Sequence, residues 1–135
     1  EISSLKFPIP LCDVIEILPS DHFVLKVLGA KIEGRMHDNL IYKAYSILKE
    51  KHNIAPVRIV LQKNIPMGAG IGGGSADATF TLIGLNDYFK LNLLKETLKE
   101  YADQLGSDCP FFVENKPQLA SGKGFSYWVS VVSEN

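Results

Sequence analysis

A glycine-dense stretch between a strand-like run and a helix-like run constrains this 135-residue chain more than any other feature. Five of its eleven glycines fall within residues 68–74, shortly after Pro66. Each glycine raises the entropic cost of ordering a backbone, so this density needs a compensating use. Without Cβ atoms, loop N–H groups can approach a phosphate closely, and the N-terminus of a following helix adds the positive end of its dipole. We therefore expect residues 68–74 to form a phosphate-binding loop that leads into a helix.

The chain before this loop predicts two strands and a helix. Residues 13–18 and 23–28 are rich in Val, Ile and Leu and are separated by turn-forming residues, which predicts a β-hairpin. Residues 39–51 carry apolar side chains at the spacing of one helical face, with Asp38 or Asn39 as the expected N-cap.

The loop itself is bounded by a predicted strand over residues 57–63 and a predicted helix from Ser75 to about Phe89. A further helix is expected after Asn92 as its N-cap, with Gly106 as its stop. Its buried side is expected to comprise Leu94, Leu98, Tyr101, Ala102 and Leu105.

The remaining apolar segments, residues 111–113 and 119–132, are expected to be extended. The resulting order of strand, strand, helix, strand, helix, helix, strand indicates an α+β fold rather than a regular βαβ alternation. With 46% hydrophobic residues, the chain can bury one core and is too short for two ordinary domains.

Composition excludes several classes of protein. The 14 basic residues nearly balance the 15 acidic ones, so no strong overall field favours nucleic acid or an anionic membrane. Cys12 and Cys109 have no metal-type spacing and do not suggest a disulfide framework. No apolar run approaches the length of a membrane span. These features predict a cytoplasmic protein that holds its anionic ligand at a local site.

Two common phosphate-loop motifs fit the glycine segment poorly. Gly68, Gly70 and Gly73 match G-x-G-x-x-G, but the dinucleotide motif also needs a strand ending in an acidic residue about 20 positions on, where helices are expected. The Walker A motif needs a lysine immediately before Ser75, and none is present. A merely flexible turn is the remaining structural alternative.

Two motifs instead resemble the GHMP kinases. Residues 66–78 are similar to the glycine-rich loop of that family, and their string G-G-G-S-A-D-A is most similar to the diphosphocytidyl-methylerythritol kinases. Residues 105–112, L-G-S-D-C-P-F-F, resemble a second motif of the same kinases, and the two occur in the family's order.

The resemblance implies an α+β GHMP kinase N-terminal domain, of the ribosomal protein S5 domain 2-like type. It implies transfer of the γ-phosphate of ATP, with Mg²⁺, to the 2-hydroxyl of 4-diphosphocytidyl-2-C-methyl-D-erythritol in non-mevalonate isoprenoid synthesis. Asp108 is then the catalytic base, and its place between Gly106 and Pro110 suits a rigidly held carboxylate. From local sequence alone, an aspartate that caps a turn is the alternative.

Other implied site residues follow from the same resemblance. Asn39 and Leu40 match positions that line the adenine end of the nucleotide pocket, and Ser75 offers a hydroxyl to a phosphate or to Mg²⁺. Lys63 matches a basic position beside the nucleotide, although a strand-end lysine facing water fits the local sequence equally well. The implied nucleotide-binding set is Asn39, Leu40, Lys63, Pro66, Met67, Gly68, Ala69, Gly70, Ile71, Gly72, Gly73, Gly74, Ser75 and Ala76. Residues 120–124, A-S-G-K-G, match a strand and turn that we interpret as structural.

The resemblance runs from Ser4 to Gly124 and lacks family elements at both ends. A lysine-bearing strand and a substrate-gripping segment are expected upstream, and a second domain downstream. We therefore expect a domain truncated at both ends, inactive alone, with an exposed sheet edge that allows self-association. Phe125 replaces the family's usual glutamate, and residues 126–135 match poorly. Another GHMP small-molecule kinase, or a non-catalytic protein of the same fold, remains an alternative.

Overall fold

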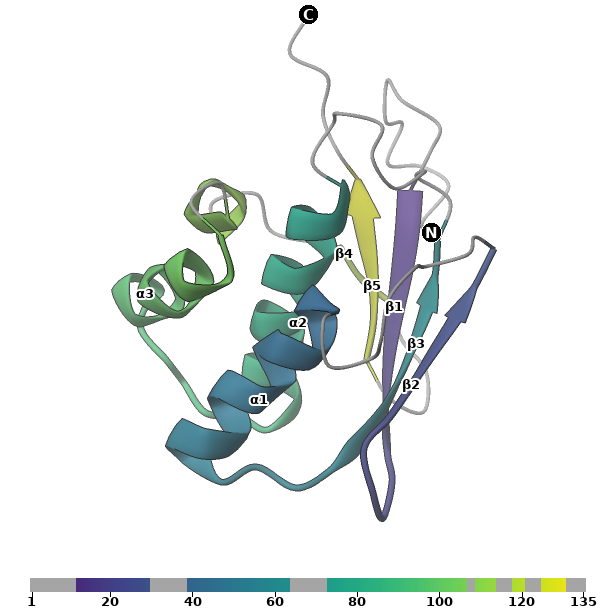
Figure 1. The fold of residues 1–135 in the computed structure, drawn as a ribbon, viewed down its shortest axis with the longest axis horizontal. Helices are drawn as coiled ribbons and strands as arrows, with labels where there is room; N and C mark the ends of the chain where they lie inside the picture. Colours follow the sequence, from purple (N-terminus) through teal and green to yellow (C-terminus); the bar gives the residue numbers. More distant parts are fainter. Residues whose placement is uncertain are drawn as a thin grey trace, which may run out of the picture.

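The computed structural model describes residues 12–29, 39–63, 73–106, 109–113, 118–120 and 125–130. One five-stranded sheet runs in the order β2-β3-β1-β5-β4, and the helices lie on one side of it (Figure 1). The strands are β1 (Cys12–Pro19), β2 (Val24–Leu28), β3 (Val57–Gln62), β4 (Gln118–Ala120) and β5 (Phe125–Ser130). Helices and strands mix without regular alternation, which confirms the predicted α+β class.

The predicted hairpin between the first two strands is wrong. Strand β1 pairs with β3 and β5, both antiparallel, whereas β2 pairs with β3 in parallel. Strand β3 therefore lies between the two strands that a short turn connects in sequence. Burial explains the order, because β1 and β3 both bury alternate residues whereas β2 has no fully buried residue and forms the edge of the sheet.

Helix α1 (Leu40–His52) joins the parallel strands β2 and β3 as a crossover connection. Its N-cap is Asn39, whose side-chain oxygen accepts a hydrogen bond from the backbone N–H of Ile41 at 2.8 Å. The helix ends at Asn53, which adopts a left-handed conformation with φ of 52°. Both the helix and its Asn39 cap are as the sequence predicts.

Helix α2 (Gly73–Tyr88) is the central helix and starts two residues earlier than predicted, inside the glycine string. It packs against β1 and β5 on the sheet side and against α1, α3 and the 3₁₀ helix η3 (Cys109–Val113) on its other sides. Every described side chain from Asp77 to Asn86 is buried, so this helix has no solvent face over that stretch.

Helix α3 (Lys95–Leu105) buries Leu98, Tyr101, Ala102 and Leu105 and stops at Gly106, as predicted. The predicted Asn92 cap is wrong, since Asn92 is in the left-handed region and the N-cap is Leu94, which makes no side-chain capping bond. Leu94 also lies 70% exposed instead of buried. Asn92 and Leu94 both lie in the connection between α2 and α3, before the first turn of α3.

Residues 111–113 were predicted to be extended but belong to η3. Pro110 at its second position has φ already near the helical value and needs no N–H partner there. The backbone N–H of Cys109 donates to the carbonyl of Gly106 at 3.0 Å, which continues the turn out of α3. The prediction of extended structure over residues 119–132 is confirmed by β4 and β5 for the residues that they cover, 118–120 and 125–130.

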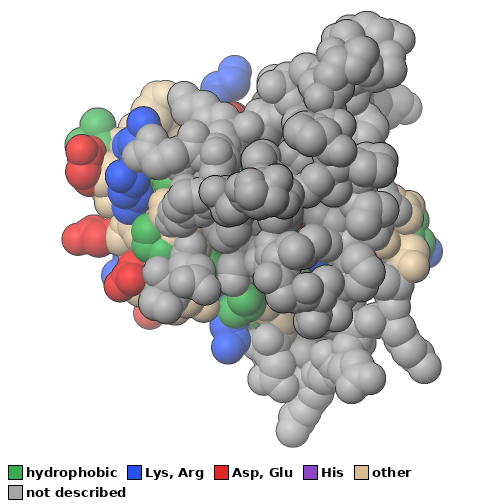
Figure 2. All heavy atoms as spheres, turned by 90° about the horizontal axis from the view of Figure 1, so that it is seen from above, with side chains coloured by type: hydrophobic (Ala, Val, Ile, Leu, Met, Phe, Trp, Pro, Cys, Tyr) green, Lys and Arg blue, Asp and Glu red, His purple; other side chains and the backbone are tan. Residues whose placement is uncertain are grey.

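The core lies between the sheet and the helices. Its largest fully buried side chains are those of Phe80, Ile15, Ile17, Leu48, Ile59, Leu61, Leu82, Leu85 and Val57. Acidic and basic side chains are interspersed at the helical end of the face in Figure 2, in line with the chain's near-zero net charge. In the ranges that the structure describes, no helix combines the length and apolarity that crossing a membrane requires.

Candidate functional site

The described structure contains both flanks of the glycine segment. Lys63 follows the last residue of β3, and α2 begins at Gly73. The backbone of Gly73, Gly74, Ser75 and Ala76 thus forms the first turn of a 16-residue helix, and this turn contains no acidic residue. A strand that leads through glycines into a helix N-terminus is the arrangement that binds phosphate groups.

Several predicted site residues lie outside the described part of the chain. These are Asp108 and the loop residues Pro66, Met67, Gly68, Ala69, Gly70, Ile71 and Gly72. The side chains of Ser75 and Ala76 are also outside it, although their backbone is described. Their roles therefore stay predictions.

Lys63 is buried, with 2% of its surface exposed. Its Nζ atom donates to Asp13 Oδ2 and to Asp77 Oδ2, each at 2.9 Å. The side chain of Lys63 is 1% exposed, that of Asp13 is 0% exposed and that of Asp77 is 2% exposed. The alternative of a lysine facing water is wrong, because the side chain turns inward to two carboxyl groups from β1 and α2.

Burial and mutual proximity shift the ionisation of this group. Burial raises the pKa of Asp77 well above its usual value, the neighbouring Asp13 carboxyl raises it further, and Lys63 only partly opposes them. For Lys63, burial alone lowers the pKa, but the two carboxyl groups outweigh it and the net direction is upward. The shifts in pKa favour the charged form of Lys63 and the protonated form of Asp77.

Asp77 Oδ1 is buried and has no hydrogen-bond partner among the described residues. An ionised carboxylate rarely leaves a buried oxygen unpaired, because the desolvation cost is then uncompensated. This observation agrees with the raised pKa of Asp77.

Asp13 is not among the residues predicted for the site, and Asp77 is predicted only as part of the glycine-rich motif. A signal was available for both residues. Asp13 occupies the same face of β1 as the fully buried Ile15 and Ile17, so the strand alternation places a charge in the core. Asp77 is the one charged residue in the first three turns of α2. What local sequence does not give is the identity of the partner.

The second motif also reaches α2. Thr79 Oγ1 donates to the backbone carbonyl of Cys109 at 3.3 Å, and both residues are fully buried. Cys109 directly follows Asp108 in sequence. Asp77 and Thr79 are two positions apart and so face nearly opposite sides of the helix. One side of α2 therefore holds the entrance to the glycine segment and the other holds the segment that carries Asp108.

Asn39 and Leu40 lie at the N-terminus of α1. The Asn39 side-chain oxygen is engaged in capping the helix, and Leu40 packs partly buried against the core. Helices α1 and α2 pack against each other, and both run from their N-termini towards the lower part of the view in Figure 1. The N-termini of the two helices therefore point in the same general direction.

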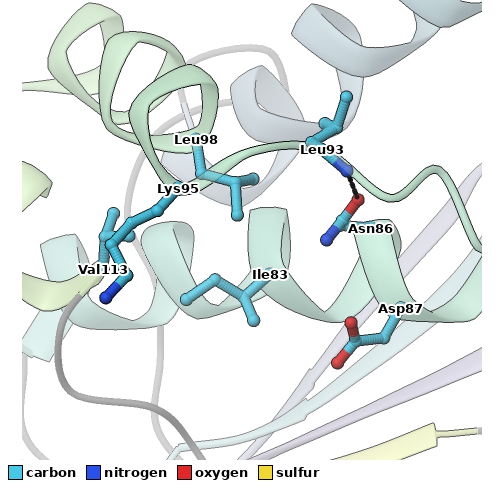
Figure 3. Close-up of a pocket in the computed structure, with 7 residues that line it drawn as sticks. All are labelled: Ile83, Asn86, Asp87, Leu93, Lys95, Leu98 and Val113. Atoms are coloured by element: carbon cyan, nitrogen blue, oxygen red, sulfur yellow. Dashed lines mark hydrogen bonds between the residues drawn. The ribbon is translucent and has the colours of Figure 1, made fainter.

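A separate pocket of about 230 Å³ lies at the other end of α2. Figure 3 shows that it is formed by side chains from α2, α3, η3 and the α2–α3 connection. One wall is fixed by Asn86, whose Oδ1 accepts the backbone N–H of Leu93 at 3.0 Å. The described residues that line this pocket include none of the predicted nucleotide-site residues; they are Ile83, Asn86, Asp87, Leu93, Lys95, Leu98 and Val113.

The described residues contain no group of three or more His, Cys, Asp or Glu side chains able to hold a metal ion. A magnesium ion shared with nucleotide phosphates needs few protein ligands, because it keeps several waters and binds phosphate oxygens. The described residues therefore form no metal site built from protein ligands alone, and they are compatible with a magnesium ion that is bound mainly through nucleotide phosphates.

Comparison with known proteins agrees with this geometry. The family "GHMP kinases N terminal domain" matches residues 39–116. The chain is 47% identical over 127 residues to the 4-diphosphocytidyl-2-C-methyl-D-erythritol kinase of Bacteroides fragilis, covering 91% of this chain and 46% of that protein. It is 45% identical over 124 residues to the same kinase of Azobacteroides pseudotrichonymphae, covering 92% and 46%. This chain thus spans about half the length of the curated relatives that it matches.

Solved structures give the same result. A crystal structure of 4-(cytidine 5'-diphospho)-2C-methyl-D-erythritol kinase superposes with a TM-score of 0.61 at 34% identity, covering 83% of this chain and 39% of that one. A putative homoserine kinase from Listeria monocytogenes, at 20% identity and a TM-score of 0.51, shares the fold. Because the family match covers more than half of the chain, including the helices on which the candidate site is built, this chain belongs to the GHMP kinase family.

Proposed function

We propose that this chain supplies the ATP-binding half of a kinase that phosphorylates the 2-hydroxyl of 4-diphosphocytidyl-2-C-methyl-D-erythritol. The observation that carries the proposal is the strand, glycine segment and helix N-terminus formed by β3, residues 64–72 and α2. The relatives that share this segment carry that activity in their names, at 41% to 47% identity. Below, "the full-length enzyme" is a protein of the relatives' length that carries this chain.

In this proposal the backbone N–H groups of residues 67–76 surround the ATP phosphates, and the free N–H groups of the first turn of α2 add to the positive potential. Asn39 and Leu40, at the N-terminus of α1, lie towards the adenine end. Lys63 stands at the entrance of the loop. Ser75 is the proposed protein ligand of Mg²⁺, which when bound would neutralise negative charge on the ATP phosphates.

Asp108 is the proposed general base. Its carboxylate accepts the proton of the substrate 2-hydroxyl while that oxygen attacks the γ-phosphorus. The new O–P bond forms as the bond from the γ-phosphorus to the β,γ-bridging oxygen breaks, and ADP leaves with that oxygen. The tether from Thr79 to the carbonyl of Cys109 keeps this segment against α2, whose N-terminus faces the phosphates.

The test is a transfer assay with the full-length enzyme and γ-labelled ATP. Diphosphocytidyl-methylerythritol, homoserine and mevalonate are compared as acceptors, and only the first is expected to be labelled. Labelling of homoserine or mevalonate instead would assign a different GHMP kinase activity. Absence of labelling with every acceptor, in a protein that still binds ATP, would favour a non-catalytic relative.

Asp108→Asn in the same enzyme tests the role of the base. Asparagine keeps the shape but cannot accept the proton, so turnover is expected to fall about 10² to 10⁴-fold. ATP affinity and thermal unfolding temperature are expected to stay near their wild-type values. A variant that keeps more than a tenth of the turnover contradicts the assignment.

We also propose a cytoplasmic location and weak self-association through the end strands of the sheet, β2 and β4. The location is supported by the buried Cys109 thiol, which suits a reducing compartment. Edge strands present unpaired backbone groups that a second copy can pair with. Sedimentation at several protein concentrations measures the association.

A further inference from the structure

We propose that Lys63, Asp13 and Asp77 form a buried clamp across the two ends of the glycine segment. In this proposal Lys63 and Asp77 are positioning residues, which act on ATP by holding the loop in shape. The inference rests on the proposed function for its effect on ATP, but its structural part can be measured without any nucleotide.

The clamp closes one defined stretch of chain. Lys63 directly precedes the segment and Asp77 lies in the second turn of the helix that follows it, so their bond at 2.9 Å joins both ends of residues 64–76. Asp13 holds the same ammonium from the neighbouring strand β1, also at 2.9 Å. The backbone N–H of Lys63 donates to the carbonyl of Leu28 at 2.6 Å. Three elements, β1, β2 and α2, thus fix one lysine.

The location matters because five glycines make this stretch costly to order. A connection between its ends reduces the number of conformations that it can adopt. Apolar residues of similar volume would fill the same space with equal or greater stability, since burying charged groups carries a large desolvation cost. Apolar side chains would not fix the distance and direction between β1, the end of β3 and α2, as the two hydrogen bonds from the Lys63 ammonium do. The polar cluster is therefore better explained by loop geometry than by stability.

The clamp is organised so that one of its members can be replaced selectively. Asp77 Oδ1 has no hydrogen-bond partner among the described residues, and Asp77 is favoured in its protonated form. A neutral amide matches the protonated form that the raised pKa favours, and its oxygen can still accept the hydrogen bond from Lys63 Nζ. An apolar side chain at this position removes the tie to α2 but leaves the Lys63–Asp13 pair, and no charge loses its partner.

The experiment compares Asp77→Leu with Asp77→Asn in the full-length enzyme. Asp77→Leu cuts the clamp and is expected to raise the KM for ATP about tenfold or more, the effect of one charge-assisted hydrogen bond. The KM for the second substrate and the thermal unfolding temperature should change little. Asp77→Asn, the matched control, should keep the ATP KM within about threefold of wild type. Should Asp77→Leu not fold, Asp77→Ala, which adds no volume, carries the same comparison.

Hydrogen exchange without nucleotide provides the second measurement. Backbone amides of residues 64–76 should exchange at least about tenfold faster in Asp77→Leu than in Asp77→Asn, while those of α3 and β3 exchange equally in both. Faster exchange in a protein that neither binds ATP nor transfers phosphate would support the clamp and refute the proposed function. Equal exchange and equal ATP KM in the two variants would overturn the clamp. A large increase in the KM of both substrates in Asp77→Asn would also overturn the clamp, because that variant keeps the hydrogen bond to Lys63.

Discussion

A single methyl group added at Gly29 is expected to destabilise the protein, because it would displace the end of β3 that leads to Lys63. Gly29 lies just after β2 with φ of +93°, a conformation that residues with a Cβ rarely adopt. A Cβ built on it would lie 2.5 Å from the backbone oxygen of Lys63 and 2.6 Å from Nε2 of Gln62. The glutamine side chain can rotate away, but the oxygen belongs to the backbone at the end of β3 and can move only with that backbone.

The magnitude follows from two contributions. Holding alanine in the left-handed region costs about 1 to 2 kcal/mol. Separating the strand ends stretches the 2.6 Å hydrogen bond from the Lys63 N–H to the Leu28 carbonyl, which is worth about 1 kcal/mol. We therefore expect Gly29→Ala to lower the free energy of unfolding by about 2 to 3 kcal/mol, or the midpoint temperature by about 5 to 15 °C.

Urea unfolding followed by circular dichroism measures this loss. Gly106→Ala is the matched control, because its backbone is extended and its added Cβ would lie 3.5 Å from Cys109 Sγ, an ordinary contact. The control is expected to lose less than about 1 kcal/mol. The reasoning is refuted if Gly29→Ala unfolds within about 0.5 kcal/mol of wild type, or if both variants lose the same amount.

Three further predictions concern α2 and its two tethers. Gly73→Val, which places a branched side chain at the start of α2, is expected to weaken ATP binding far more than second-substrate binding; calorimetry with each ligand checks this, and equal losses would instead indicate unfolding. Thr79→Val removes the donor to the Cys109 carbonyl and is expected to cost about 1 kcal/mol and to lower kcat more than ATP affinity, whereas Thr79→Ser should restore both. Folding raises the pKa of Asp77, so the stability that its protonated form contributes is fully present below its unfolded pKa near 4 and is lost as the pH rises through the folded pKa. Asp77→Asn has no such loss, so its free energy of unfolding relative to wild type should rise from about pH 4 upward, by at most about 1.4 kcal/mol per pH unit. Urea titrations at several pH values measure this difference, and a flat difference would contradict the raised pKa.

Local patterns were sufficient for much of the secondary structure. Apolar spacing and a short polar cap predicted α1 with Asn39, and the buried face of α3 with Gly106 as its stop. Glycine density between a strand and a helix predicted the approach to the candidate site through β3 and α2. These features depend on residues within one or two turns of each other, so a local reading of the chain contains the necessary information.

Pairing partners were decided only by the tertiary structure. A tight turn between β1 and β2 predicted a hairpin, yet β3 lies between them, because its alternating buried residues extend the buried face of β1 within the same sheet. Residues 109–113 likewise form a 3₁₀ helix because the chain leaving Gly106 continues turning against α2.

The buried cluster of Lys63, Asp13 and Asp77 shows the same division. By itself the sequence determined that a lysine precedes the glycine segment and an aspartate follows it, and it left open whether that lysine faces water. Only the fold brought Asp13, fifty positions away, to the same ammonium and removed all three side chains from solvent. The physical reason is that the energy of a charge depends on what surrounds it in space, and those surroundings come from strands and helices that are distant in the chain.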